Sequence, residues 1–267
     1  MSSTYLTDFQ NLNVKNIIFS ETYNGKYSKF IPIGYSCDDQ DEEIHKLILN
    51  TPPNLFTNGI IPKYDNKTRT DIVGYNMFIN MWNKRDGPTE EQKLFCDKLE
   101  EILKYMKAFL TSIKEELNID QKLIDDLRIL SSFGSNEDSE DYQPKLFCKL
   151  MLNNKSKKIL TQFINEETNE MIDPKDLIKK NGLVTTALKF ENISISDSRI
   201  TLEIRVFEVL YKELKKSKRT SILKPEIEIS SNKKFYMNKN KAVDDDKRKN
   251  KMPVNQNPFS ALSVEED

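Results

Sequence analysis

Hydrophobic and polar residues alternate along much of the chain, and this alternation predicts strands. Successive side chains of a strand point to opposite faces, so a half-buried strand repeats every two residues. Six segments fit this pattern: 14–20, 26–35, 144–152, 157–165, 184–195 and 199–212. The first two flank the turn-prone ETYNG, which predicts a hairpin. Strand pairs in this order favour an antiparallel meander or a small barrel over a parallel sheet.

A second periodicity predicts a long helix over residues 89–117. Thr89 and Gln92 form a capping-box pattern at its start. Large apolar residues then recur at steps of three and four: Phe95, Leu99, Ile102, Met106, Phe109, Ile113 and Leu117. This stripe is most simply a face that packs on a sheet, and a docking surface for a partner protein is the alternative.

Shorter helices are expected over 38–50, 119–130 and 173–182. The last of them has Asp173 as N-cap, Pro174 in its first turn and Gly182 as its terminator. Helices and strands together give an α+β protein.

The composition changes after residue 212 and indicates two parts. Residues 1–212 form the predicted domain, with a helical insertion at 89–130. Residues 213–267 are first basic and then acidic, and they contain little that could be buried. We therefore expect a flexible tail with an acidic end, disordered over 231–267.

Charge and motifs exclude several classes of function. Lys plus Arg number 41 and Asp plus Glu 42, so the net charge points to no particular partner. GxxxxGK[ST] and GxGxxG are both absent. The one histidine, His45, and three separated cysteines, Cys37, Cys96 and Cys148, fit reduced structural residues better than a zinc site or a His-based triad. We therefore expect no catalytic residues, metal or cofactor.

The hydropathy of the chain predicts a soluble, intracellular protein. No apolar run approaches the roughly 20 residues that span a bilayer. The first residues also lack the apolar core of a signal peptide. We expect no membrane partner.

Cations and aromatic rings share faces of the predicted strands. Proteins that bind single-stranded nucleic acid need cations along the phosphates and flat rings on which bases stack. Lys145, Phe147 and Lys149 lie on one face of 144–152, opposite an aliphatic face. In 199–212 the polar face carries Thr201, Glu203, Arg205, Phe207 and Val209, and a third platform combines Lys157, Lys158 and Phe163. The alternative is that these phenylalanines pack under the long helix.

The densest cluster of basic and aromatic residues lies between 63 and 85. Its members are Lys63, Tyr64, Lys67, Arg69, Tyr75, Phe78, Trp82, Lys84 and Arg85. Basic residues interleaved with rings suit an extended single strand. The alternative is a strand that buries Met77, Ile79 and Met81 while Phe78 and Trp82 shield an edge.

The acidic end of the tail is a candidate partner-binding segment. It combines apolar and acidic residues: Phe259, Leu262, Val264, Glu265, Glu266 and Asp267. Such a segment can compete with DNA for a basic surface or recruit replication or repair proteins. The alternative is a solvated tail without a partner. The basic run KKSKR (215–219) fits nuclear import or phosphate contact.

The order of four segments resembles the single-stranded-DNA-binding proteins of nucleocytoplasmic large DNA viruses, of the African swine fever virus type. These segments are KYDNKTRTDIVGYNMFINMW, EEQKLFCDKLEEILKYM, PKLFCKLMLNNKSKKILTQFIN and GLVTTALKFENISISDSRITLEIRVFEVLYK, together spanning roughly 60–212. The resemblance implies an OB-like β-barrel decorated by helices that binds single-stranded DNA without catalysis. It implies a general binding role for Lys145, Phe147, Lys149, Arg205 and Phe207.

Three hypotheses follow. The first is sequence-tolerant binding of single-stranded DNA, with RNA as a second possible ligand, in viral DNA replication, recombination or repair. The protein would then act at the viral replication site in the host cytoplasm or nucleus, or be packaged in the virion. The second is a virion or scaffold interaction protein that docks through 89–117 and the acidic tail. The third, an enzyme acting on nucleic acid, has the least support because no metal-binding carboxylate set or nucleophile–base pair is visible.

Overall fold

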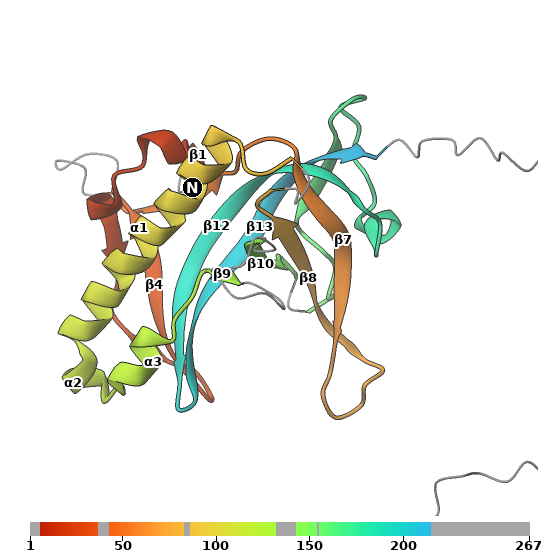
Figure 1. Cartoon of the computed structure of the whole chain (residues 1–267). Helices are drawn as coiled ribbons and strands as arrows, with labels where there is room; N and C mark the ends of the chain where they lie inside the picture. Colours follow the sequence, from red (N-terminus) through yellow and green to blue (C-terminus); the bar gives the residue numbers. More distant parts are fainter. Residues whose placement is uncertain (1–5, 37–42, 83–85, 132–142, 154, 215–267) are drawn as a thin grey trace, which may run out of the picture. The chain divides into compact units, whose positions relative to one another are not determined.

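The computed structural model describes residues 6–36, 43–82, 86–131, 143–153 and 155–214. All of them belong to the first of two units of the chain, Met1–Ser217. The predicted tail, with Phe259, Leu262, Val264, Glu265, Glu266 and Asp267, lies outside the described residues, as do Lys84 and Arg85. Within the described part the protein is α+β, with a large sheet and flanking helices (Figure 1).

The strands and helices have the following bounds. The strands are β1 Leu6–Thr7, β2 Ile17–Phe19, β3 Tyr23–Asn24, β4 Lys29–Tyr35, β5 His45–Lys46, β6 Ile48–Asn50, β7 Leu55–Tyr64, β8 Ile72–Asn80, β9 Leu130–Ser131, β10 Lys145–Leu150, β11 Gln162–Asn165, β12 Gly182–Ser196 and β13 Arg199–Glu213. The α-helices are α1 Glu90–Ser112, α2 Lys114–Leu117 and α3 Gln121–Asp125, and single 3-10 turns are Phe9–Asn11, Val14–Asn16 and Pro174–Leu177. None of the helices in the described ranges is long and apolar enough to cross a membrane.

Five strands close into a ring in the order β7, β8, β10, β13, β12 and back to β7. Four of the five pairings are antiparallel, and β10–β13 is parallel. Outside the ring, β11 pairs with β13 and β1 with β6, both also in parallel. The expected antiparallel arrangement is therefore wrong in these three pairings. Parallel neighbours need a long crossover, and residues 151–198 supply it between β10 and β13.

The sheet continues beyond the ring through β4, which pairs with β12 and carries β2, β3 and β5. The hairpin predicted around ETYNG is confirmed, since Ile17 of β2 pairs with Tyr35 of β4. Helix α1 lies beside β4 and β12 (Figure 1). Phe95 packs edge-on to Phe9, with ring centroids 5.1 Å apart, and Phe109 stacks on Phe19 of β2, with centroids 4.1 Å apart.

The long helix is confirmed, and its stripe is a core face. Thr89 and Gln92 form the capping box in both directions. Phe95, Leu99, Ile102 and Met106 are each at most 1% exposed. The helix breaks at Ile113 and continues as α2, so one predicted helix is two. These four residues are therefore not available to a partner protein, and Phe109, Ile113 and Leu117 are half-buried against the same core.

The helix predicted over 38–50 is wrong in its described part, 43–50. These residues form β5 and β6, and β6 lies between β1 and β12. Leu47, Ile48 and Leu49 are consecutive and each at most 1% exposed. A run that is buried on both faces belongs to an interior strand.

Three further predicted elements are shorter than expected. The helix of 119–130 is confined to α3, because Leu130 and Ser131 pair with β10. Strand 157–165 is ordered as β11 only from Gln162. In 173–182 the helix is one 3-10 turn, although Asp173 does cap it by accepting from the Lys175 backbone N–H. Gly182 ends no helix. It begins β12, where a Cβ atom would lie 2.2 Å from the Tyr211 ring.

Candidate nucleic-acid interface

The outer face of β8, β10 and β13 collects rings and cations from three separate segments. Strand alternation places Met77, Cys148 and Ile204 in the core, at most 3% exposed, and turns the intervening residues outward. Phe147 pairs with Phe78 in the antiparallel β10–β8 ladder. Lys149 pairs with Arg205 in the parallel β10–β13 ladder. We call Phe78, Lys145, Phe147, Lys149 and Arg205 the outer platform.

Two aromatic rings lie next to each other on this platform. The centroids of Phe78 and Phe147 are 5.1 Å apart, with the planes tilted by 57°. Phe147 is 41% exposed, and Phe78 is half-buried. The exposure of Phe147 between two lysines is confirmed, and its burial under the long helix is excluded. An exposed ring supported from one side by a second ring can stack on a base without rearrangement.

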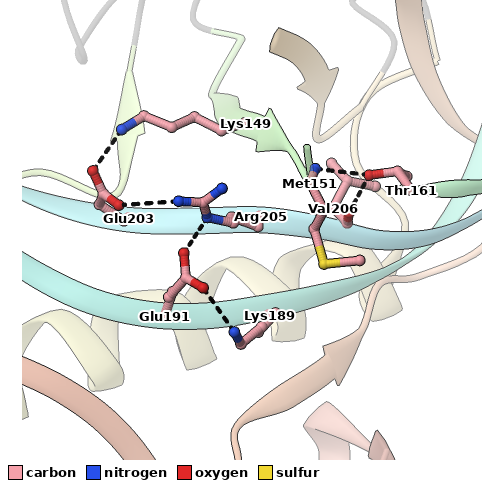
Figure 2. A network of polar contacts seen from close by, with 8 residues as sticks. All are labelled: Lys149, Met151, Thr161, Lys189, Glu191, Glu203, Arg205 and Val206. Atoms are coloured by element: carbon pink, nitrogen blue, oxygen red, sulfur yellow. Dashed lines mark hydrogen bonds and ion pairs between the residues drawn. The ribbon is translucent and has the colours of Figure 1, made fainter. Parts of the chain in front are cut away.

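Two of the three platform cations, Lys149 and Arg205, are paired with carboxylates (Figure 2). Lys149 Nζ lies 2.6 Å from Glu203, and Arg205 Nη2 lies 3.8 Å from the same carboxyl. Arg205 Nε also contacts Glu191, which binds Lys189 Nζ at 2.8 Å. Three cations thus share two carboxylates, and the network retains one net positive charge.

Glu191 is held ionised within this network. Burial acts to raise its pKa and is the largest single effect. The hydrogen bonds and charges of Lys189 and Arg205 act in the opposite direction and together leave the pKa of Glu191 below its ordinary value. The carboxylate therefore stays a fixed negative charge beside Arg205 at neutral pH.

Phe207 lies at a β-bulge that changes the phase of β13. Ala187 pairs with Glu208 and Leu188 with Val206, so Phe207 is the extra residue. Beyond the bulge Val209 and Tyr211 point inward, at 0% and 3% exposed. The prediction that Val209 shares a face with Arg205 is therefore wrong. Phe207 itself is half-buried.

Phe163 does not form a third platform. It is 0% exposed and pairs with Val209 at the β11–β13 ladder, where both side chains enter the core. A ring without an exposed face cannot stack on a base. Lys157 and Lys158, predicted with it, are exposed in the turn before β11.

The β7–β8 hairpin carries the first part of the predicted cluster. Lys63, Tyr64, Lys67 and Arg69 are all exposed along it, and the hairpin projects away from the ring (Figure 1). Asp65 orders the turn by accepting from the backbone N–H groups of Thr68 and Lys67, at 3.1 and 2.7 Å. These two hydrogen bonds lower the pKa of Asp65.

The second part of the cluster divides between a hollow and the core. Tyr75 lines a hollow of about 370 Å³ together with Lys157, Lys158 and Lys175. The fold thus brings together residues predicted from two distant segments. It adds Lys175, two residues after the cap residue Asp173, which the sequence analysis did not identify. Trp82 is half-buried and packs against the core, so it is not an open platform.

Sequence reasoning also missed the acidic partners of the platform. Glu203 is two positions before Arg205 and Glu191 two after Lys189, so strand alternation alone places each pair on one face. That shared face was predictable, whereas the pairing of Lys149 with Glu203 and of Arg205 with Glu191 depends on the register of neighbouring strands.

The two described cysteines keep their thiols protonated at neutral pH. Cys148 is buried in the core, which raises the pKa of its thiol. Burial, followed by the charges of Asp97 and Glu100, raises the pKa of Cys96 to about 12. Across the described ranges no group of three or more His, Cys, Asp or Glu could hold a metal ion.

Comparisons with known proteins give a family and several distant likenesses. A family model described as "Protein of unknown function (DUF2738)" matches residues 12–250. The uncharacterized protein 007R of Invertebrate iridescent virus 3 is 21% identical over 179 residues, which is 66% of this chain and 38% of that protein. The chain therefore spans about two fifths of this relative's length.

Two solved structures share a distant similarity of fold. One is the single-stranded DNA-binding protein from bacteriophage Enc34 in complex with ssDNA, with a TM-score of 0.36 and 9% identity over 76% of this chain and 98% of that one. The other is gp2.5, a single-stranded DNA-binding protein encoded by bacteriophage T7, with a TM-score of 0.38 and 10% identity over 64% and 88%.

Proposed function

Because the chain belongs to the DUF2738 family, whose function is not known, we propose a function from the geometry of the site itself. We propose that the protein binds single-stranded DNA across the outer platform, without catalysis and with little sequence preference. Bases stack on Phe147 and Phe78, and phosphates pair with Lys145, Lys149 and Arg205. We place this activity in viral DNA replication, recombination or repair, at the viral replication site.

The observation that carries the proposal is the exposed ring of Phe147, which contacts the half-buried Phe78 and lies beside cations from two strands. Stacking on an aromatic ring is worth roughly 1–3 kcal/mol per base and works with any base. Phe147 is a large apolar side chain left 41% exposed in a sheet whose other face is fully packed. An exposed ring adjacent to Lys145 and Lys149 meets both requirements of single-strand binding.

The strand order of the ring supports the same surface. OB-folds are five-stranded barrels that bind oligonucleotides on the face of their second and third strands and with the loops between strands 1–2 and 4–5. In the ring described here the second and third strands are β8 and β10, which carry Phe78 and Phe147. The loop between the first two strands is the basic β7–β8 hairpin. We therefore infer an OB-like barrel with the platform at its binding face.

The exposed β7–β8 hairpin extends this surface, because Lys63, Lys67 and Arg69 offer cations on it. The Tyr75 hollow, with Lys157 and Lys158, lies on the other face of β8, since Tyr75 is two residues before the buried Met77. The hairpin cations suit phosphates that leave the platform along β8. Because the whole chain is near neutral, the binding energy depends on this local concentration of cations.

A titration of labelled oligo-dT at two salt concentrations tests the proposal. We expect binding that weakens with salt and that exceeds binding of duplex DNA. Phe147→Ala should lower the affinity by about 5- to 150-fold, the equivalent of one lost stacking contact. Tyr27→Ala is the matched control, because Tyr27 is an 80% exposed ring away from the platform. No affinity for oligo-dT at low salt would overturn the proposal, and tighter binding of oligo-U would assign the surface to RNA.

The interaction-protein hypothesis has lost one of its two docking surfaces. The stripe of α1 lies in the core, with Phe95 and Leu99 at most 1% exposed. Its remaining support is the acidic tail, which lies outside the described residues. We therefore retain DNA binding as the single proposed function.

A further inference from the structure

A second hollow, of about 400 Å³, lies beside the outer platform. Its polar and aromatic lining consists of Tyr23, Lys46, Lys189, Glu191, Asn192 and Arg205. Arg205 belongs to both surfaces: it pairs with Lys149 of β10 on one side and with Lys189 of β12 on the other. The hollow therefore continues the platform across β13 and β12 toward β4.

The hollow contains a supported aromatic ring. Tyr23 of β3 stacks on Phe30 of β4, with ring centroids 5.3 Å apart and planes 22° apart. Phe30 is itself fixed, because β4 pairs with β12 at Ser194. Tyr23 is nevertheless 50% exposed. One side of its ring is thus supported while much of the side chain stays accessible, as at Phe147.

The charges around this ring are mainly positive. Lys46, Lys189 and Arg205 face the hollow, and Glu191 is the one carboxylate among its lining residues. Glu191 already contacts both Lys189 and Arg205. Lys46 is exposed and forms no ion pair within the described part of the chain. A phosphate can therefore bind at Lys46 without first displacing a carboxylate.

A buried amide in the hollow lacks a hydrogen-bond donor. Asn192 is 7% exposed, and its Oδ1 accepts no hydrogen bond from any described residue. Buried polar atoms are nearly always paired, so an unpaired one calls for an explanation. A ligand that brings an N–H group would provide the missing partner. The Watson–Crick edges of all four DNA bases carry such donors.

We propose that this hollow binds one further nucleotide of the single strand. Its base stacks on Tyr23 and its phosphate pairs with Lys46 and Lys189, while Asn192 accepts from a base N–H. This subsite rests on the proposed function and extends it past Arg205. The path from β10 to β4 crosses three strand spacings, about 14 Å, which suits OB-type sites of roughly 4–16 nucleotides.

The length of the oligonucleotide separates this subsite from the platform. Affinities are measured for the full chain with oligo-dT of about 4 and about 16 nucleotides. Tyr23→Ala should leave the short oligonucleotide unaffected and weaken the long one by about 5- to 150-fold. Tyr23→Trp should restore the affinity, since a ring is retained. Tyr27→Ala, on the same hairpin but outside the hollow, should change neither.

A second variant tests the phosphate contact without disturbing the ring stack. Lys46→Gln should weaken only the long oligonucleotide and reduce the slope of log K against log salt by about 0.7. Lys26→Gln is the charge-matched control, because Lys26 lies over the exposed Tyr27 ring and outside the hollow.

The outcomes distinguish the subsite from the platform. If Tyr23→Ala and Lys46→Gln both bind the long oligonucleotide like the unaltered protein while Phe147→Ala loses binding, the subsite is wrong and the proposed function stands. If the unaltered protein binds neither length, both proposals fail. Weaker binding of the long oligonucleotide by both variants, with unchanged binding of the short one, supports the subsite.

Discussion

At the scale of single residues, the Glu203 carboxylate competes with phosphate for the cations of the outer platform. Glu203 lies within 4 Å of both Lys149 and Arg205, at 2.6 and 3.8 Å. Its side chain is 14% exposed, so solvent screens it less than a surface carboxylate. A phosphate that binds these cations must replace Glu203 as their partner. The acid therefore lowers affinity and limits binding to ligands that supply several contacts at once.

Removing this carboxylate should strengthen DNA binding. We expect Glu203→Gln to bind oligo-dT several-fold more tightly at low salt, because Lys149 is then available to a phosphate. The slope of log K against log salt should steepen by about 0.7 for each cation that is freed. Fluorescence titrations over a salt series measure both quantities.

A surface ion pair on α1 provides the control for this variant. Glu90 pairs with Lys93 at 2.8 Å, is 91% exposed and lies at the start of α1, outside the platform strands. Glu90→Gln makes the same change in net charge and should leave affinity and slope almost unchanged. Equal effects of the two variants would mean that net charge alone governs binding.

At the scale of elements, the register of β7 against β8 depends on one glycine. The pairing of the two strands shifts between Thr57 and Ile60, and Gly59 lies at this bulge with φ +81. A Cβ atom there would meet the carbonyl oxygens of Leu177 and Lys180 at 2.4 and 2.5 Å. Both contacts are with backbone atoms, which cannot move aside as a flexible side chain can.

Gly59→Ala should therefore destabilise the domain, by about 1–3 kcal/mol from the backbone conformation, with the close contacts adding to it. Gly74→Ala is the matched control in the partner strand. Its φ is not positive, and the nearest atom to an added Cβ is 3.9 Å away. Urea unfolding followed by circular dichroism gives both free energies of unfolding. Equal midpoints for the two variants would contradict the role assigned to Gly59.

Elements with a clear local pattern were predictable from the sequence, and those set by their neighbours were not. The α1 capping box and the exposed face of β10 follow from spacing alone. Phe163 and Val209 could not be placed, because their faces depend on the parallel docking of β11 and on the bulge at Phe207. The acidic start and later apolar residues of 38–50 predict a helix, and this local pattern does not show that residues 48–50 pair with β1 and β12.

At the scale of the molecule, the chain divides into the described domain and the predicted tail. The last described element, β13, ends at Glu213, and the sequence beyond it is the predicted tail. The platform and the hollow beside it are built entirely from residues before that point. If the acidic end competes with DNA for the platform, its removal should change DNA binding without changing the fold of these residues.

A chain truncated after Pro258, which loses the acidic end and keeps the basic residues before it, should fold and should bind oligo-dT more tightly than the full chain at low salt. The acidic end is then absent, and electrostatic competition of this kind weakens as salt increases. Thermal melting and the same titrations test the two parts of this prediction. Equal or weaker binding by the truncated chain would contradict competition between the acidic end and DNA.

The order of strands in the ring also has a consequence for synthesis. β7, β8 and β10 are adjacent in the ring and are made first, so the Phe78–Phe147 pair can form while the rest of the ring is missing. Until the β12–β13 hairpin is inserted between them, β7 has an unpaired edge, and β10 has one beyond Lys145 and Leu146, which pair with β9. Either edge can join another chain. A ribosome adds about 5–20 residues per second. The nascent protein therefore carries open strand edges for seconds. Substitutions that slow the translation or docking of the β12–β13 hairpin should increase aggregation without altering the finished fold.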